Sequence, residues 1–477
     1  MKTSNPLITE YPLMEGAFLY GTSLGNILIG APPEILKVLL IQHRPMPETI
    51  VIPGTLYKFS SSQACLEFPF YHFLFVQQGL ARGKKFKVLA KKHICEKLKD
   101  MLRITLLGPG EEEALGAEKR LNLPEKTDKN RLKQIIRENN HLALKNKENK
   151  TLELEDMVEF IPFEVGDKQV VHEAYNGHAE VSIERRGEDE FTVKCDVEFN
   201  CNIRITKPQA PVYTIKGIKI TNAERESPKL FSVRSLGASE GFDPTQPANG
   251  FLLRYNKKWI LWDCPVYLRQ HLNMIGLEFD EIDAIVISHV HEDHLDILES
   301  IQEGKKVTVY TTPEIFHCML LKLVAVLDCT YEQAQTYYDF HPLYTNQEFD
   351  LFGAKAEVFY SAHVIPALGL RLTVPAKDKD SKLFISGDTL SKRMLKQLSD
   401  ANIFSDERKK EVENFLPNSS EYNLIFHDSG AGIIHGDHED LVSNPNTVLY
   451  MHTGKEIKDI PENHKQLKLG QRFLIHH

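Results

Sequence analysis

The feature that most constrains this chain is a cluster of histidines and carboxylates that directly follows a strongly apolar segment. Residues 284–288, with the sequence AIVIS, have the β-branched composition of a strand buried inside a sheet. The next six residues, 289–294, are HVHEDH. Imidazoles and carboxylates at this density suit zinc, iron or manganese, and side-chain packing alone seldom gathers them. The pattern therefore predicts a metal site at the carboxyl end of a buried strand, in preference to a solvated polar turn.

Further histidines and aspartates follow other segments that have the composition of strands. Asp263 ends KKWILWD, His363 follows VFYSA, Asp388 follows KLFISG and His452 follows TVLYM. A single polar residue at the end of a strand is ordinary. Successive strand ends that supply only histidine and aspartate indicate instead that the strands bring these side chains to one metal site.

These residues form the motif set of a known superfamily. HVHEDH matches the HxHxDH motif of the metallo-β-lactamase superfamily, and the residues named above fall in order at its other four motifs. The chain from about Phe231 to Lys455 therefore resembles this superfamily. The resemblance implies an α/β fold, a four-layer αββα sandwich with two divalent metal ions at one edge between its sheets.

The resemblance also implies a role for each motif residue. One metal ion would be held by His289, His291 and His363. The second would be held by Asp293, His294 and His452, with Asp293 also taking part in catalysis. Asp388 would bridge the two ions, and Asp263 would hydrogen-bond beside them without acting as a ligand. Zinc is the first expectation for the metal, with iron and manganese as alternatives.

The aspartate at position 388 narrows the expected chemistry. A bridging carboxylate is typical of the phosphodiesterases and thioesterases of the superfamily, whereas its β-lactamases have a cysteine there. A carboxylate between two cations keeps them close enough for a bridging water to lose its proton near neutral pH. The expected enzyme is therefore a hydrolase that uses a metal-bridging hydroxide.

The segments around Asp388 resemble the RNase Z and cyclic-nucleotide phosphodiesterase branch of the superfamily. They read ISGDT at 385–389, NLIFHDSG at 423–430, IIHGDHEDL at 433–441 and VLYMH at 448–452. The resemblance aligns His427 and Asp428 with a His-Glu pair of that branch, and either His435 or His438 with its catalytic histidine. A histidine steered by a carboxylate can act as general acid for the leaving oxygen. The replacement of Glu by Asp and the shorter spacing leave the choice of histidine open, with an ordinary surface turn as the alternative.

The function that these observations predict is a phosphodiesterase acting on a nucleotide-like or RNA phosphodiester. The alternatives are a thioester or lactone hydrolase and a di-iron redox or oxygen-sensing protein. The formal net charge of −9 disfavours a general nucleic-acid-binding surface, so a small nucleotide is favoured over a bulky RNA. The sparse cysteines indicate a cytoplasmic protein, no apolar run is long enough to span a membrane, and a homodimer is left open.

The N-terminal half repeats the order of parts found around the metal motif. We expect a catalytic domain at 230–477 and a separate α/β domain at 1–229. Residues 26–54 and 259–289 both contain a strand, a proline turn, a helix, an acidic linker and a buried strand. Where the second segment continues into HVHEDH, the first continues into GTLYKFSSS. The pattern predicts a degenerate copy without metal ligands, with an unrelated α/β domain as the alternative, and a charged, solvated insertion at about 110–155 that carries no chemistry.

Overall fold

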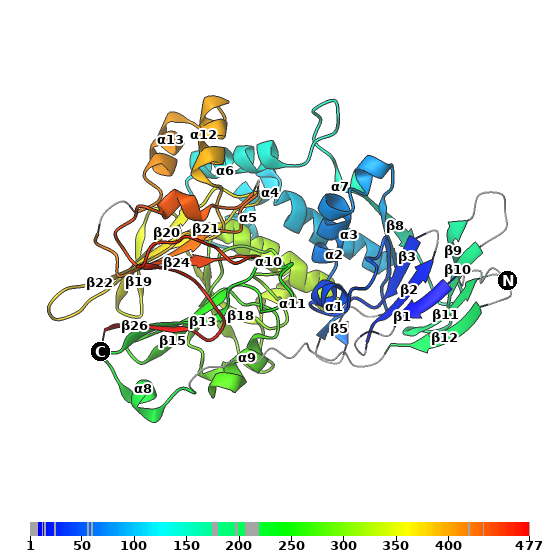
Figure 1. The fold of residues 1–477 in the computed structure, drawn as a ribbon, viewed down its shortest axis with the longest axis horizontal. Coiled ribbons are helices and arrows are strands. Elements are labelled where there is room, and N and C mark those ends of the chain that lie inside the picture. The colour runs from blue at the N-terminus through cyan, green and yellow to red at the C-terminus, as the bar shows by residue number, and fades with distance from the viewer. Residues whose placement is uncertain are drawn as a thin grey trace. The chain divides into compact units, whose positions relative to one another are not determined.

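The computed structural model describes residues 8–476 except 12, 14–15, 23–24, 55–56, 59–60, 174–179, 196–198, 206–218, 418–419 and 433 (Figure 1). Contacts divide the chain into two compact units. Unit 1 comprises Met1–Arg103, Lys145–Val212 and Leu321–Thr330, and unit 2 comprises Ile104–Leu144, Tyr213–Leu320 and Tyr331–His477.

Unit 2 contains two seven-stranded mixed sheets. The first, in the order β18-β17-β16-β15-β14-β13-β26, consists of β13 (Phe231–Gly237), β14 (Gly250–Tyr255), β15 (Lys258–Trp262), β16 (Ala284–Val286), β17 (Val307–Thr311), β18 (Tyr338–Pro342) and β26 (Arg472–His476). The second, ordered from β19 to β25, consists of β19 (Glu348–Leu351), β20 (Ala354–Tyr360), β21 (Leu368–Val374), β22 (Ser381–Ile385), β23 (Leu424–Asp428), β24 (Val448–Met451) and β25 (His464–Gln466).

The two sheets of unit 2 share a core and carry helices on their outer faces. The rings of Phe251 in β14 and Phe426 in β23 lie 4.6 Å apart, which joins the sheets. On the first sheet, Phe316 of α10 (Pro313–Leu327) stacks on Phe340 of β18 with ring centroids 3.8 Å apart. The other helices of this unit are α4 (Glu111–Leu115), α5 (Ala117–Arg120), α6 (Lys129–Leu142), α8 (Asn222–Glu226), α9 (Leu268–Ile275), α11 (Tyr331–Gln335), α12 (Lys392–Asp400) and α13 (Asp406–Glu413), with short turns η3 (Phe279–Glu281) and η4 (His438–Leu441). The predicted αββα sandwich is confirmed.

Unit 1 is built on a six-stranded sheet in the order β1-β2-β3-β4-β7-β8 and a four-stranded antiparallel sheet in the order β12-β11-β10-β9. The strands are β1 (Ile8–Tyr11), β2 (Phe18–Thr22), β3 (Gly25–Ile29), β4 (Thr49–Val51), β7 (Phe86–Ala90), β8 (Val158–Pro162), β9 (Lys168–Glu173), β10 (Glu180–Arg185), β11 (Glu190–Cys195) and β12 (Phe199–Arg204), with a separate pair β5 (Tyr57–Lys58) and β6 (Ser61–Ser62). The helices in this part of the chain are α1 (Ile35–Ile41), α2 (Glu67–Tyr71), η1 (His72–Val76), η2 (Leu80–Arg82), α3 (Lys92–Leu107) and α7 (Leu154–Met157). Side chains from both sheets form one core, which includes Ile29, Val51, Ile183 and Phe191.

The six strands of the larger sheet of unit 1 have the same order and strand senses as six of the seven strands in the first sheet of unit 2, β13 to β18. In the six strands from β1 to β8, and in the six strands from β13 to β18, the first two pairs are antiparallel and the next three are parallel; the sheet of unit 2 has β26 as an additional antiparallel strand beside β13. The equivalence extends beyond the strands. Ala31, after β3, forms an isolated parallel β-bridge with Ala64, and Cys264, after β15, forms the corresponding bridge with Leu295. Two sheets that share order, sense and an irregular bridge have the same local connectivity.

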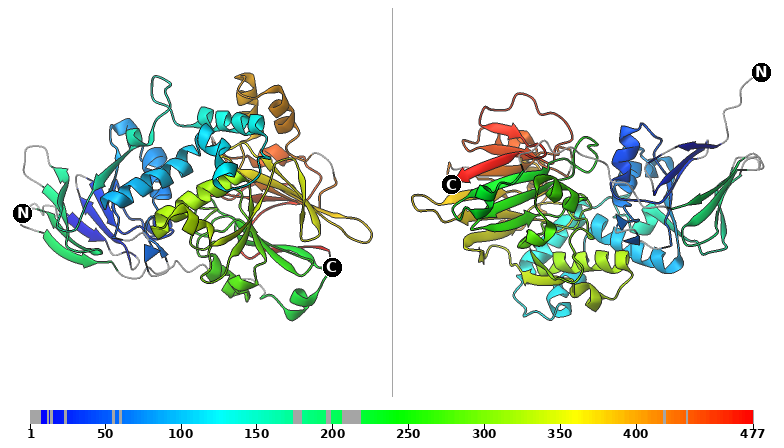
Figure 2. Two further views of the ribbon diagram at one scale, coloured as in Figure 1. Left: turned by 180° about the vertical axis from the view of Figure 1, so that it is seen from behind. Right: turned by 90° about the horizontal axis from the view of Figure 1, so that it is seen from below.

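Part of the charged segment at 110–155 packs into unit 2. Helix α6 buries Leu132, Ile135 and Ile136, whose spacing places them on one helical face. This helix lies beside α12 and α13 in two views (Figures 1 and 2), and Gln134 donates to the backbone oxygen of Ile403, which follows α12. The expectation that the whole segment is solvated is therefore wrong for α6, because its apolar stripe is diluted by charged residues on the other face.

Two further predictions concern the rest of the chain. Within the part of the chain that the structure describes, no helix combines the length and apolar character needed to cross a membrane. The described cysteines, at 65, 95, 201, 264, 318 and 329, form no disulfide bond with one another.

The contact between the two sheets predicts a large stability effect at Phe251. Replacing Phe251 by alanine should lower the free energy of unfolding by about 3–5 kcal/mol, because it leaves a cavity between the sheets. Leu474→Ala, at a side chain that is 44% exposed in β26, is the control and should change stability by less than about 0.5 kcal/mol. Urea unfolding of the metal-free protein measures both, and equal effects of the two substitutions would contradict the assignment of this core.

Candidate metal centre

The predicted metal-site residues meet at one edge of unit 2, because each follows the end of a strand. The segment after β16 supplies His289, His291, Asp293 and His294; the segments after β20, β22 and β24 supply His363, Asp388 and His452. The carboxyl ends of neighbouring parallel strands lie on the same side of a sheet, so short loops from them converge. All seven side chains are buried.

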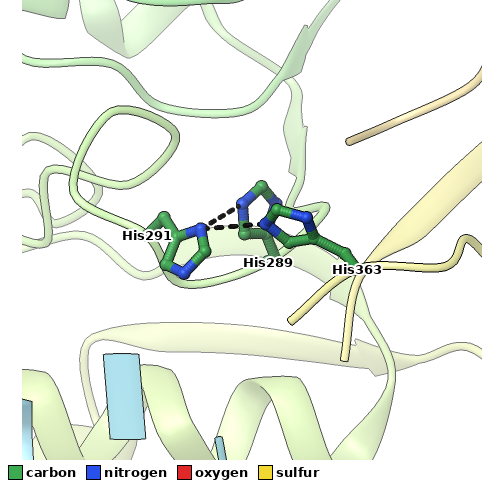
Figure 3. Close-up of side chains that lie close together, drawn as sticks. All are labelled: His289, His291 and His363. Atoms are coloured by element: carbon green, nitrogen blue, oxygen red, sulfur yellow. Dashed lines mark hydrogen bonds between the residues drawn. The ribbon is translucent and has the colours of Figure 1, made fainter. Parts of the chain in front are cut away.

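Three histidines form the first group. The Nδ1 atom of His291 lies 3.1 Å from Nε2 of His289 and 3.2 Å from Nε2 of His363 (Figure 3). Three ring nitrogens that face one another bring their lone pairs together, and a proton can be shared by only one pair at a time. A cation at this point would bind all three, which matches the predicted ligand set of one metal.

The opposite ring nitrogen of each histidine in this group has its own partner. His289 Nδ1 lies 2.9 Å from Ser288 Oγ, and His363 Nδ1 lies 3.3 Å from the backbone oxygen of Ile434. His291 Nε2 lies 3.0 Å from the backbone oxygen of Thr105. A carbonyl oxygen only accepts, so His291 and His363 donate from these nitrogens and present their lone pairs to one another.

A second group contains Asp293, His294 and His452, whose potential ligand atoms lie within 4.8 Å of one another. His452 Nε2 lies 2.9 Å from Asp293 Oδ2. Asp388 lies between the two groups: its carboxylate oxygens are 3.2 Å from His294 Nε2 and 3.9 Å from His289 Nε2. The position of Asp388 is that of a carboxylate able to contact two cations.

The electrostatics of the first group favour neutral imidazoles. Burial lowers the pKa of His289 and His291 well below the usual value, and the neighbouring histidines lower it further. Burial likewise lowers the pKa of His363, to about 4, although Asp388 acts in the opposite direction. Neutral imidazole is the form that binds a metal ion.

The second group is organised by charge. Burial by itself would lower the pKa of His294, but the carboxylates of Asp388 and Asp293 outweigh it and raise that pKa well above the usual value. Burial would raise the pKa of Asp388, but His294 and His452 hold it well below its usual range. Asp388 is therefore an ionised carboxylate surrounded by nitrogen donors.

The donor set fits metal ions. The buried atoms His294 Nε2 and Asp388 Oδ1 face one another at 3.2 Å, and neither makes a hydrogen bond of normal geometry within the part of the chain that the structure describes. Buried polar atoms without a well-formed hydrogen bond are costly, and a cation bound by both atoms would satisfy them. Imidazole nitrogen and carboxylate oxygen are also the ligands that zinc and related divalent metals take.

Asp263 makes hydrogen bonds that orient a residue of the metal centre. Its carboxylate accepts hydrogen bonds from Ser288 N at 2.8 Å and Ser288 Oγ at 2.9 Å, and it lies 2.8 Å from His294 Nδ1. These contacts turn His294 so that its Nε2 faces Asp388. Asp263 therefore orients a candidate ligand, and it is outside the groups of potential ligands among the described residues.

The loop after β23 brings one of the two candidate general-acid histidines to the centre. His435 Nδ1 lies 3.1 Å from Asp428 Oδ2 and 3.7 Å from Asp388 Oδ2. Asp428 is itself fixed, since its Oδ2 also accepts from the backbone nitrogen of Thr389 at 2.9 Å. His438 instead pairs with the neighbouring Asp437 at 2.9 Å and lies outside the groups of potential metal ligands.

Sequence reasoning did not identify Glu240. Burial raises the pKa of its carboxyl, while His452 and His435 lower it, so this carboxyl lies near the metal centre. A Cβ at Gly454 would lie 2.0 Å from Glu240 Oε1, which shows how closely the side chain covers this glycine. An isolated glutamate in a loop carries no sequence pattern that would have indicated this position.

The family model described as Anti-Pycsar protein Apyc1 matches residues 231–474. The chain is 30% identical over 223 residues to the cAMP/cGMP-dependent 3',5'-cAMP/cGMP phosphodiesterase B of Dictyostelium discoideum, covering 46% of this chain and 20% of that protein. It is 25% identical over 235 residues to the Anti-Pycsar protein Apyc1 of Paenibacillus harenae, covering 45% of this chain and 85% of that protein. The match therefore spans only about a fifth of the length of the Dictyostelium relative.

Similar solved structures include the metallo-β-lactamase fold protein YhfI from Bacillus subtilis, with 15% identity, a TM-score of 0.37 and coverage of 52% of this chain and 99% of that one. They also include human tRNase Z, short form, with 17% identity, a TM-score of 0.35 and coverage of 52% and 100%. The predicted resemblance to cyclic-nucleotide phosphodiesterases is confirmed by the Dictyostelium relatives, at 30% and 28% identity.

The contacts of Asp263 predict an effect on metal binding. Asp263→Ala should weaken binding of divalent metal about 10- to 100-fold, because His294 loses the acceptor that orients its ring. Asp339→Ala is the matched control, since that carboxylate is 62% exposed in β18 and pairs with the exposed His341. Titration of metal-free protein with Co²⁺, followed by visible absorption, measures the affinity; unchanged binding by Asp263→Ala would refute the orienting role.

Proposed function

The chain belongs to the family of Anti-Pycsar protein Apyc1, and from this premise we propose that it is a binuclear metal-dependent phosphodiesterase that hydrolyses a 3',5'-cyclic nucleotide. The observation that carries the proposal is the carboxylate of Asp388 between two groups of histidines, 3.2 Å from His294 Nε2 and 3.9 Å from His289 Nε2. A bridging carboxylate supports phosphodiester chemistry over β-lactam chemistry. Two divalent cations bound here supply Lewis acidity and an activated water nucleophile.

The chain's own residues supply the proton for the leaving group. Asp428 accepts a hydrogen bond from His435 Nδ1, which fixes the ring and directs its Nε2 away from the carboxylate. A protonated His435 can then donate from Nε2 to the leaving oxygen, and Asp428 stabilises the cationic ring. The distance of 3.7 Å between His435 Nδ1 and Asp388 keeps this proton donor beside the reacting phosphate. We assign the general acid to His435 in preference to His438.

Two features support a small cyclic nucleotide over RNA as the substrate. The Dictyostelium relatives are cyclic-nucleotide phosphodiesterases by name, at 30% and 28% identity. The net charge of −9 opposes extended contact with a polyanion. Zinc is the metal proposed first, since the mixed imidazole and carboxylate ligands are those it commonly takes. A cytoplasmic location is proposed on the sparse cysteines of the sequence.

We further propose that unit 1 is a metal-free copy of the fold. Gly54 follows the end of β4 by the same interval that separates His289 from β16. Gln63 directly precedes Ala64, which forms a β-bridge with Ala31 after β3. In the same way, His294 directly precedes Leu295, which forms a β-bridge with Cys264 after β15. A Cβ at Gly54 would meet Glu188 Oε2 at 1.9 Å, so a side chain from β10–β11 fills the space of the missing ligand. Glycine and glutamine at these positions cannot replace two metal-binding imidazoles.

Replacing either of the two candidate histidines by alanine should have different effects on kcat. His435→Ala should lower kcat for 3',5'-cAMP or 3',5'-cGMP about 100- to 10,000-fold, the range typical of a lost general acid. His438→Ala is the matched control and should leave kcat within about threefold. Steady-state hydrolysis by metal-loaded protein measures both; a large loss in His438→Ala with none in His435→Ala would reverse the assignment. Hydrolysis of a thioester or lactone in place of every phosphodiester tested would overturn the proposed function itself.

The metal content of the full chain tests the centre and the proposed copy together. We expect two metal ions per chain after loading with zinc, all of them in unit 2. Asp388→Ala should retain at most one, because both ions lose a ligand, while His341→Ala, at a half-exposed histidine, should retain two. Elemental analysis of the dialysed protein gives these numbers. Four ions per chain would contradict a metal-free unit 1.

A further inference from the structure

We propose that the segment Ile104–Leu144, which lies outside the residues matched by the family model, is a positioning element of the metal centre that orients His291 and His363. These contacts belong to unit 2, because this segment is part of that unit. The inference concerns metal binding and stands whether or not the substrate is a cyclic nucleotide.

The first contact sets the tautomer of His291. Its Nε2 lies 3.0 Å from the backbone oxygen of Thr105, and both atoms are buried. Thr105 lies in the last turn of α3, where a backbone oxygen can accept a hydrogen bond from outside the helix. A proton held on Nε2 by this carbonyl leaves Nδ1 unprotonated. Nδ1 is the atom that faces His289 and His363.

The second contact holds the backbone of His363. Asn139 Nδ2, on α6, donates to the backbone oxygen of His363 at 2.7 Å, and the Asn139 side chain is only 3% exposed. His363 lies in the loop between β20 and β21, where no ladder hydrogen bond restrains it. Asn139 therefore restrains the backbone that carries a predicted metal ligand.

The third contact reaches the same loop through a buried ion pair. Glu138 accepts from Arg408 Nε at 3.1 Å and Nη2 at 3.1 Å. Arg408 in turn donates from Nη1 to the backbone oxygen of Tyr360 at 2.9 Å and from Nη2 to that of Ser361 at 3.2 Å. Both charged side chains are at most 4% exposed. Neighbouring residues of α6 thus fix the backbone at 360, 361 and 363, directly or through Arg408.

These contacts differ from ordinary helix packing. A helix that only covers the sheet would bury its apolar stripe, which α6 does through Leu132, Ile135 and Ile136. Burying an amide and an ion pair as well is costly unless their partners are well placed. All of the partners on the strand side are backbone oxygens at the end of β20 or in the loop that carries His363. The expected consequence of losing them is a displaced ligand and weaker metal binding, with the sandwich intact.

The test uses the full chain and a matched pair of asparagines. Asn139→Ala should weaken binding of Co²⁺ by metal-free protein about 10- to 100-fold and alter the visible absorption of bound Co²⁺, as expected when a partner of a ligand is removed. Asn140→Ala, at the exposed neighbouring residue, should match the parent in both measurements. Asn139→Asp should resemble Asn139→Ala, because a carboxylate cannot donate to the backbone oxygen of His363.

A second substitution separates positioning from folding. Glu138→Gln keeps the size of the side chain but removes the charge that holds Arg408, and it should weaken Co²⁺ binding in the same direction. Thermal unfolding of the metal-free proteins reports whether each variant is folded. If Asn139→Ala is unfolded, Glu138→Gln decides the question alone. Folded variants that bind Co²⁺ with the parent's affinity and spectrum would overturn the inference, and the measurement needs no phosphodiesterase activity.

Discussion

The buried carboxylate of Asp388 and the imidazoles around it form the interaction on which the rest of unit 2 depends. Its oxygens lie within 4.0 Å of nitrogen atoms from His289, His294, His363 and His452. Such a concentration of ionisable groups, removed from water, is unfavourable unless cations and hydrogen bonds compensate it. The two sheets place the ends of several strands, which are far apart in the sequence, at one edge. Short loops after these strand ends bring the candidate ligands close together, where cations and hydrogen bonds can compensate the buried charge.

Left-handed backbone conformations turn the chain abruptly where these loops begin. Asp263 and His452 adopt left-handed φ values of 64° and 60°, which are uncommon for residues other than glycine. Gly387, directly before Asp388, has φ of 61°, and a Cβ there would lie 2.1 Å from the backbone oxygen of Leu368. These turns redirect the chain within two residues of each strand end. The rigid sheets and the metal-site contacts together hold conformations that would be unfavourable in a free loop.

The two units share connectivity and differ in what their strand ends carry. Glu34 before α1 and Tyr267 before α9 have nearly the same left-handed φ, 57° and 59°, so even the turn into the helix corresponds. Unit 1 nevertheless presents Gly54 and Gln63 where unit 2 presents imidazoles. The apolar core stabilises a fold of this kind, as in the core that the two sheets of unit 1 share. Metal chemistry depends instead on a few residues that follow the strands.

The sequence by itself determined the fold class and indicated the candidate ligands, because each candidate follows an apolar strand and this pattern is local. It could not choose between His435 and His438, which are three residues apart in one loop; only the tertiary structure decided which ring meets Asp428. Nor could it identify α6, since His291 and Thr105 are separated by 186 residues and Asn139 and His363 by 224. Contacts at such separations depend on how whole elements pack, and no local periodicity records them. A charged helix with a narrow apolar stripe was therefore expected to be solvated, and the structure buries it beside the metal centre.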